Sequence, residues 1–439
     1  MNNNVNTNES SIISYSHFID NLNNDAVTIR LKSLRRLRNL IDKGETSEPE
    51  RGNDVNNHIH TTYSFSPYSP AKSVWMAYTS GLITAGIMDH DSIGGAEEFI
   101  EAGRIMNIPT TIGVECRADF SSTPLNGRRI NNPDQSSIAY VTLHGIPHTK
   151  IDVVRKYFVP YTNERNKRNR LMVERINNLF APFNIKQDFD NDVVPISKFH
   201  DGGSITERHI LYSLALKLME KFGKGENLTD FLKNKLHIKL KVNLENYLMD
   251  ATNPFYEYDL LGVLKSDLIS SIYIDAKKEC PDIKEFIEFS NSIGAISAYA
   301  YLGDVADSVT GDKKTQKFED EYIEELFDIL KELGFNAVTY MPSRNTRVQL
   351  KRVKALCEKH GLFQISGEDI NSPRQSFVCK AMRDEEFNNL IDSTWALIGH
   401  EKAATKNLED AMFSKKTIEK YLNLNDRIAI YKNKHNTKI

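Results

Sequence analysis

Short apolar runs alternate with amphipathic segments from Asn57 onward, and this alternation constrains the fold more than any other feature of the chain. Residues 69–82 have the spacing of a helix, and residues 83–95 form an apolar run that passes into a polar loop. Residues 96–107 are again helical in pattern, and residues 108–120 again have the pattern of a strand. This order of strand, polar loop and helix is typical of a parallel α/β sheet or barrel.

The same alternation returns in the second half of the chain after a long interruption. Residues 151–290 are mostly helical in pattern, and strand and helix signals then alternate again up to Gln375. We therefore expect a parallel α/β sheet or barrel that is divided by a helical insertion. The predicted segments are an N-terminal helical extension (1–50), two parts of the barrel (51–150 and 291–380), the insertion (151–290) and a C-terminal helical segment with a tail (381–439).

Composition narrows the possible classes of protein without naming a function. The 439 residues carry 56 Lys and Arg against 59 Asp and Glu, and this balance gives no indication of a nucleic-acid coat. No run of about 18 apolar residues occurs, so we expect no membrane span. The first residues lack the basic and apolar regions of a signal peptide. The four cysteines form no CxxC pair, which favours reduced thiols and a cytoplasmic protein.

Metal-type side chains follow the predicted strands at the points where the strands end. In parallel α/β folds these carboxyl ends meet at one edge of the sheet, where sites are built. The two-residue spacing of His58 and His60 puts both imidazoles on one face of a strand. Mixed imidazole and carboxylate ligands suit Zn, Mn or Fe better than Mg or Ca. The residues at the strand ends are His58, His60, Asp89, His90, Asp91, Glu115, His144, His148, Tyr299, Glu368, Asp369 and Asn371.

Each of these features alone has an ordinary structural explanation. Two histidines on a strand can form the polar side of a sheet edge, and the sequence Asp-His-Asp can be a turn or a helix cap. A single glutamate at a strand end carries little information. Because successive strand–loop junctions each supply a metal-type side chain, chance is a poor explanation, and the sequence predicts a metal site.

Taken together, the motifs resemble the PHP (polymerase and histidinol phosphatase) family of metal-dependent phosphoesterases. The family motif HxHTxxS matches "HIHTTYS" at residues 58–64, and the strand followed by DH matches "IMDHDSIGG" at residues 87–95. The strand that ends in Glu matches "TIGVECRADF" at residues 111–120, and a later strand histidine matches His144. The final motif, SGxDxH, is similar to "SGEDIN" at residues 366–371.

This resemblance extends over about Asn57 to Phe377 and implies a distorted (βα)7, TIM-like barrel with the helical insertion over the mouth of the site. Three positions depart from the family pattern. Tyr299 stands where the family has a ligand histidine, Asn371 replaces the last histidine of the final motif, and Phe65 replaces an aspartate of the exonuclease branch. The reduced ligand set implies one or two divalent transition-metal ions, Zn, Mn or Fe.

The resemblance also implies roles for individual residues. His58, His60, Glu115 and Asp369 would hold one ion, and His90, a shared carboxylate and His144 would hold a second. Asp89 is expected to orient His90 through its ring N–H rather than to bind an ion directly. Together the predicted metal ligands are His58, His60, His90, Glu115, His144 and Asp369.

Three further residues have a possible catalytic role and an ordinary alternative. Tyr299 could bind an ion, donate a proton to the leaving oxygen or only pack. Arg374 could clamp a phosphate through its guanidinium or lie on the surface. His209, next to Arg208, could reach the site from the insertion or lie on a solvated helix face.

A basic helix opens the insertion and could attract an anionic substrate, although such a run is more often a solvated face. Its cations are Arg165, Lys167, Arg168, Arg170 and Arg175.

The predicted function is hydrolysis of a small phosphorylated metabolite, a nucleotide or a short oligonucleotide through a metal-activated water. One alternative is a catalytically degenerate barrel that binds or regulates. A second alternative is a hydrolase of C–N bonds. It is weaker because such barrels usually carry a bridging lysine, and no such lysine can be identified in this sequence. We expect neither a membrane nor a stable duplex nucleic acid as a partner, and the sequence does not indicate an oligomeric state.

Overall fold

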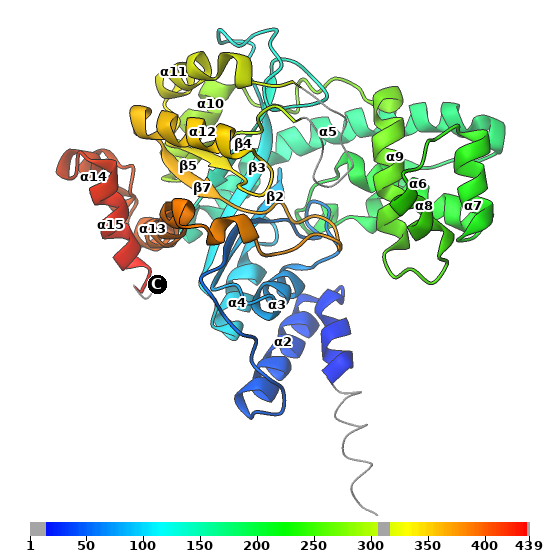
Figure 1. The fold of residues 1–439 in the computed structure, drawn as a ribbon, viewed down its shortest axis with the longest axis horizontal. Coiled ribbons are helices and arrows are strands. Elements are labelled where there is room, and N and C mark those ends of the chain that lie inside the picture. Colours follow the sequence, from blue (N-terminus) through cyan, green and yellow to red (C-terminus); the bar gives the residue numbers. More distant parts are fainter. Residues whose placement is uncertain (1–14, 306–316, 437–439) are drawn as a thin grey trace, which may run out of the picture.

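Seven strands form one sheet in the computed structural model, which describes residues 15–305 and 317–436. The order in the sheet follows the order in the chain, from β1 to β7. This confirms the predicted barrel-like α/β fold (Figure 1). The strands are β1 (Val55–Ile59), β2 (Thr84–His90), β3 (Thr110–Asp119), β4 (Ile138–His144), β5 (Ile296–Ala300), β6 (Ala337–Tyr340) and β7 (Phe363–Ser366).

The sheet curves so far that its two edges meet. The backbone N–H of His60 donates to the carbonyl of Ile370 (3.0 Å), and the N–H of Ile370 donates to the carbonyl of His58 (3.2 Å). These two bonds form an isolated parallel bridge between Ile59 and Ile370. The barrel is therefore nearly closed, and its seam lies beside the two histidines of the first motif.

Strand β4 departs from the expected parallel arrangement. It pairs antiparallel with both β3 and β5, while every other neighbouring pair in the sheet is parallel. Its last residue, His144, pairs with Ile296, the first residue of β5. The carboxyl end of β4 therefore lies at the level of the amino end of β5, not at the edge where the parallel strands end.

Amphipathic helices between the strands cover the barrel with their apolar sides. Ser69 caps the first of them by accepting a hydrogen bond from the N–H of Lys72. Gly334 and Gly361 end two others with positive φ angles of 89° and 63°, a conformation that glycine adopts without steric cost. These helices are α3 (Pro70–Thr79), α4 (Ala96–Met106), α10 (Ile283–Ile293), α11 (Ile323–Leu333) and α12 (Arg347–His360).

A separate helical lobe lies between β4 and β5 in the sequence, to one side of the barrel (Figure 1). It has its own apolar core, which includes Met172, Phe180, Leu214 and Leu260. Phe65, from the loop after β1, is part of this core, so the loop that follows the first motif is anchored in the lobe. The lobe contains α5 (Ile151–Phe180), α6 (Glu207–Phe222), α7 (Glu226–Asp230), α8 (Val242–Met249) and α9 (Tyr256–Ile272).

Further helices flank the barrel at both ends of the chain. Arg30 of α2 (Val27–Asp42) forms a buried ion pair with Glu98 of α4, with 2.8 Å between Nε and Oε1. α13 (Asn388–Lys406) packs against β7, and α15 (Leu424–Lys434) packs on α13, with α14 (Lys415–Lys420) between them in sequence. Within the described residues, no helix has the length and apolar character needed to cross a membrane.

Candidate metal centre

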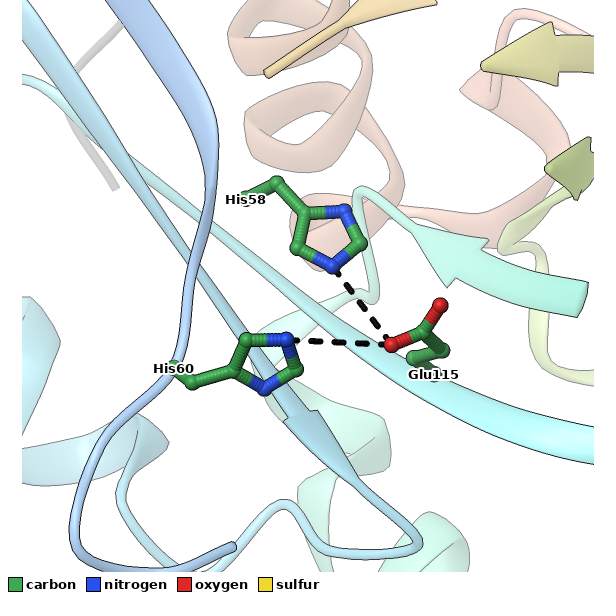
Figure 2. A group of neighbouring side chains, drawn as sticks. All are labelled: His58, His60 and Glu115. Carbon is green, nitrogen blue, oxygen red and sulfur yellow. Dashed lines mark ion pairs between the residues drawn. The ribbon is translucent and has the colours of Figure 1, made fainter. Parts of the chain in front are cut away.

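Two imidazoles and a carboxylate meet inside the barrel. His58 and His60 come from β1 and its end, and both rings point toward Glu115 of β3 (Figure 2). The Nε2 atom of His58 is 3.5 Å from Oε2 of Glu115, and that of His60 is 3.7 Å from the same oxygen. One ligand atom from each residue lies within 4.8 Å of the others, and all three side chains are buried.

The strand register brings His90 and Asp369 to the same place. β2 and β3 pair so that His90 lies opposite Glu115, which leaves 3.2 Å between Nδ1 of His90 and Oε2 of Glu115. Asp369 follows β7 next to the seam, where its Oδ1 lies 3.1 Å from Nε2 of His60. Asn371 donates a hydrogen bond of 2.6 Å to the same Oδ1 atom. Asn371, which stands where the PHP motif has a histidine, therefore holds Asp369.

His144 enters the barrel from a different direction because β4 is antiparallel. It is almost fully buried, and it is close enough to His58 and Glu115 for their charges to act on its pKa. Burial lowers the pKa of His144 to about 3, so its ring is neutral near pH 7. The predicted residue is near the cluster, but not at the strand edge where the sequence placed it.

Several ring nitrogens of this cluster have no hydrogen-bond partner within the described part of the chain. These are the Nε2 atoms of His58, His60 and His144, all of which are buried. Buried polar atoms in folded proteins are nearly always satisfied, so an unpaired one needs an explanation. Imidazole nitrogens next to a carboxylate are ligands that Zn²⁺ and related ions bind. The donor set therefore fits a divalent transition metal.

The electrostatics of the cluster keep its carboxylates ionised. Burial alone would raise the pKa of Glu115, but His90, His58 and His60 outweigh it and lower the pKa to about 2. The pKa of Asp369 lies well below its usual value, because His60, His58 and Arg208 outweigh its burial. Burial lowers the pKa of His90 to about 3. The centre thus combines ionised carboxylates with a neutral imidazole.

Asp89 has other partners than the one predicted for it. Its Oδ1 accepts hydrogen bonds from the N–H of Thr61 (2.7 Å) and the hydroxyl of Ser64 (2.6 Å), and its Oδ2 accepts one from the hydroxyl of Thr61 (2.6 Å). The expectation that it orients the ring of His90 is therefore corrected. Asp89 holds the loop after β1 instead, which explains the Thr and Ser positions of the first motif.

Tyr299 and Arg374 are both engaged away from the centre. Tyr299 is fully buried in the main core, and its hydroxyl donates to Glu319 (3.1 Å), so the packing alternative describes its placement. Arg374 forms two bonds of 2.7 Å with the carboxylate of Asp259 in the lobe, over the ring of Tyr247. This placement gives the predicted phosphate clamp no support, because Nε and one Nη atom of the guanidinium already bind a carboxylate.

His209 is part of a helix cap rather than a solvated face. Its Nδ1 accepts a hydrogen bond of 3.0 Å from the N–H of Thr206 at the start of α6. Its ring is buried and meets the ring of Phe65 edge-on, with 5.0 Å between centroids. The prediction that His209 takes part in catalysis has no support from this position, and the alternative of a solvated face is wrong.

The basic helix does not present an open row of cations. Arg165 and Arg168 are buried and paired with carboxylates, Lys167 pairs with Glu164, and Arg170 pairs with Asp190. Arg175 donates to the carbonyl of Tyr273. Arg165 and Arg168 therefore have an internal role. The exposed ion pairs of Lys167 and Arg170 fit the alternative of a solvated face, and the attraction of an anionic substrate gains no support.

Sequence reasoning missed the importance of Arg208, the second residue of α6. Its side chain is half-buried, and its charge helps to lower the pKa of Asp369. Unlike Arg374, Arg208 forms no ion pair with the described residues. The only signal in the sequence was its position next to His209.

Comparisons with known proteins give limited similarity. No family model matches the chain, and no curated protein matches it. Among solved structures, the chain is similar to one from Bifidobacterium adolescentis described as a "putative metal-dependent phosphoesterase", with 18% identity, a TM-score of 0.49, and coverage of 78% of this chain and 98% of the other. It is also similar to an amidohydrolase from Chromobacterium violaceum with bound sulfate and no metal, with 15% identity, a TM-score of 0.48, and coverage of 74% and 90%. Since identity and TM-score are both low, we assign the fold from the strand order and the candidate site from its own side chains.

Proposed function

We propose that the protein is a hydrolase that depends on a divalent transition metal bound by His58, His60 and Glu115. The observation that carries this proposal is the pair of buried Nε2 atoms that form no hydrogen bond with the described residues and lie 3.5 and 3.7 Å from one oxygen of Glu115. The lone pairs of these nitrogens and the carboxylate oxygens are ligands that one divalent cation would satisfy together. Asp369, His90 and His144 are further ligand candidates around the same centre.

We further propose that the substrate is a phosphoester and that the chain is a member of the PHP family. The sequence motifs support this, because the residues that resemble the family pattern are those that gather in the barrel. Arg208 supports an anionic substrate, since its charge acts on Asp369 and its guanidinium forms no ion pair with the described residues. A small phosphorylated metabolite, a nucleotide or the end of a short oligonucleotide has the required charge.

In this function a bound ion would supply Lewis acidity and a water of lowered pKa. The chain's own residues provide the rest. His58, His60 and Glu115 would hold the ion, and Asn371 holds the carboxylate of Asp369 next to His60. Arg208 would bind oxygens of the phosphoryl group, because a guanidinium pairs well with phosphate. Asp89, through Thr61 and Ser64, fixes the loop that carries His60.

The direct test is hydrolysis of a generic aryl phosphomonoester by the purified protein with added Mn²⁺. We expect turnover that a chelator removes and that Mn²⁺ restores. The His58→Ala, His60→Ala double variant should show none, and a His17→Ala, His200→Ala variant should behave as wild type because both histidines are exposed. Activity that survives the first double variant would refute the assignment. Metal binding without turnover would favour the degenerate binding protein, and turnover of an amide alone would favour a C–N hydrolase.

A further inference from the structure

A second buried cluster of charges lies where the helical lobe meets the barrel. It joins three arginines to three carboxylates, and the exposed fraction of every side chain lies between 4% and 16%. The members are Asp91, Arg117, Arg165, Arg168, Glu207 and Glu279. We call this set the interlobe ion cluster. With three positive and three negative charges it is neutral as a whole, so it can remain buried without a further counter-ion.

The cluster is built on the same strands as the metal centre. Arg117 lies on β3 two residues after Glu115, and therefore on the same face of the strand. Its guanidinium binds Glu279 (2.6 Å) and Glu207 (3.3 Å), which come from the insertion. Arg168 of α5 binds the same two carboxylates, with 2.8 Å between its Nε and Oε2 of Glu279. This half of the cluster joins the lobe to β3.

Arg165 of α5 reaches a different part of the barrel. It binds Glu207 (2.7 Å), as Arg168 does, but it also forms an ion pair with Asp91. Asp91 follows His90 directly and has a positive φ of 51°, a conformation that side chains other than glycine adopt infrequently. Its backbone N–H donates to the carbonyl of Glu115 (2.8 Å). Asp91 therefore connects His90 to the backbone of Glu115, and its side chain is bound by Arg165.

Two further hydrogen bonds join the lobe to the loop after β2. The hydroxyl of Ser204 donates to the carbonyl of His90 (2.5 Å), and the hydroxyl of Ser92 donates to the carbonyl of Gly202 (2.8 Å). The residues on both sides of Asp91 are thus bonded to the segment before α6. The left-handed conformation of Asp91 is maintained from the lobe as well as by the sheet.

We propose that Arg165 is a positioning residue for the metal centre. Its ion pair with Asp91 fixes the loop after β2, and this keeps the ring of His90 against Glu115. The helical lobe is then part of the support for the centre and not only a cover over it. The inference rests on the proposed function for its consequence, but the positioning itself can be measured without metal.

The experiment compares Arg165→Lys with Arg168→Lys. Both variants lose planar pairing with Glu207 in the same buried cluster. Arg165→Lys also loses Asp91, and Arg168→Lys also loses Glu279, so each variant loses two carboxylate partners and only the first loses the one beside His90. Hydrogen–deuterium exchange of the metal-free proteins should rise at least tenfold in the peptide that contains residues 88–92 in Arg165→Lys, and should stay at the wild-type rate in Arg168→Lys. Mn²⁺ titration should show affinity about 10- to 100-fold weaker in Arg165→Lys alone, as for other supporting partners of metal ligands.

Equal exchange in this peptide for the two variants would overturn the inference. If Arg165→Lys does not fold, Asp91→Asn provides the same test, because asparagine tolerates the left-handed backbone and removes only the charge. Rapid exchange in Asp91→Asn supports the proposal, and wild-type exchange overturns it. Failure of the wild-type protein to bind Mn²⁺ would instead refute the proposed function, while the exchange measurement would still decide the role of Arg165.

Discussion

Two buried polar clusters in this protein differ in how their members are satisfied. In the interlobe ion cluster, three guanidiniums face three carboxylates, and its net charge is zero. In the metal centre, imidazoles surround Glu115, and the Nε2 atoms of His58 and His60 have no hydrogen-bond partner among the described residues. The first cluster balances its charges within the described chain, although Nε of Arg165 has no hydrogen-bond partner there. The second combines imidazole nitrogens with carboxylate oxygens, the donor set that a divalent metal ion would take.

The largest expected effect comes from removing the charge of the central carboxylate in the metal centre. Glu115→Gln removes the carboxylate between the imidazoles, so we expect metal affinity to fall by more than about 100-fold, beyond the loss found for supporting partners, with phosphoesterase activity falling in parallel. The free energy of unfolding should change little. Mn²⁺ titration and denaturant unfolding of the same preparation measure both quantities.

Removing a carboxylate charge from the interlobe ion cluster should instead lower the stability of the fold and leave metal affinity nearly unchanged. Glu279→Gln leaves Arg117 and Arg168 facing one carboxylate fewer, and loss of one partner in a buried ion pair costs about 3–5 kcal/mol. Metal affinity should stay within a few-fold of wild type, as roughly expected for a site that the variant does not contact. If Glu279→Gln abolished metal binding while Glu115→Gln only reduced stability, the assignment of the two clusters would be reversed.

A third buried carboxylate extends the comparison to pH. Glu319 accepts hydrogen bonds from Tyr299, Leu302 and Gly303 through Oε1, while its buried Oε2 has no partner in the described chain. Burial raises the pKa of Glu319 to about 7 from an ordinary value of 4.5. The folded protein thus keeps a proton that the unfolded chain releases, and stability should fall as pH rises from about 4.5 to 7.

Glu319→Gln removes this titration and should flatten the stability profile over that pH window. The difference between the two profiles should reach a few kcal/mol, at about 1.4 kcal/mol for each unit of pKa shift. Denaturant unfolding at pH 5 and pH 8 measures it. Profiles of equal slope for the variant and the wild type would show that Glu319 is ionised throughout this range.

The smallest expected effect distinguishes two arginines, one whose charge acts on Asp369 and one that is bound in the lobe. Arg208 has no ion pair within the described residues, whereas Arg374 is bound to Asp259. Arg208→Gln should raise KM for a phosphomonoester by about 10- to 100-fold, since a hydrogen bond to a charged group contributes about 1.5–3 kcal/mol. Arg374→Gln should leave KM unchanged and reduce stability. A larger rise in KM for Arg374→Gln would restore the predicted phosphate clamp.

The sequence was sufficient to predict the barrel and the gathering of metal-type side chains. Parallel strands end at one edge of a sheet, so His58, His60, His90 and Glu115 could be placed together from strand order alone. The direction of β4 could not be read from its apolar pattern, because a strand has the same period of two in either direction. The position of His144 was therefore only partly predicted.

The ion-pair partners of the arginines could not be predicted for a different reason. Arg165 pairs with Asp91, and Arg374 pairs with Asp259, which lies 115 residues away in the chain. Such partners are set by the packing of the lobe on the barrel, and nothing in the local sequence distinguishes a paired guanidinium from a free one. The same holds for Asp89, whose three hydrogen bonds go to Thr61 and Ser64.

The central claim is that His58, His60 and Glu115 bind a divalent metal ion. Titration of the metal-free protein with Mn²⁺, followed by electron paramagnetic resonance of the free ion, measures this binding without any assumption about substrate. We predict saturable binding of at least one ion per chain in the wild type and in the His17→Ala, His200→Ala control. The His58→Ala, His60→Ala variant should lose it. Equal binding in both double variants, or none in the wild type, would contradict the claim.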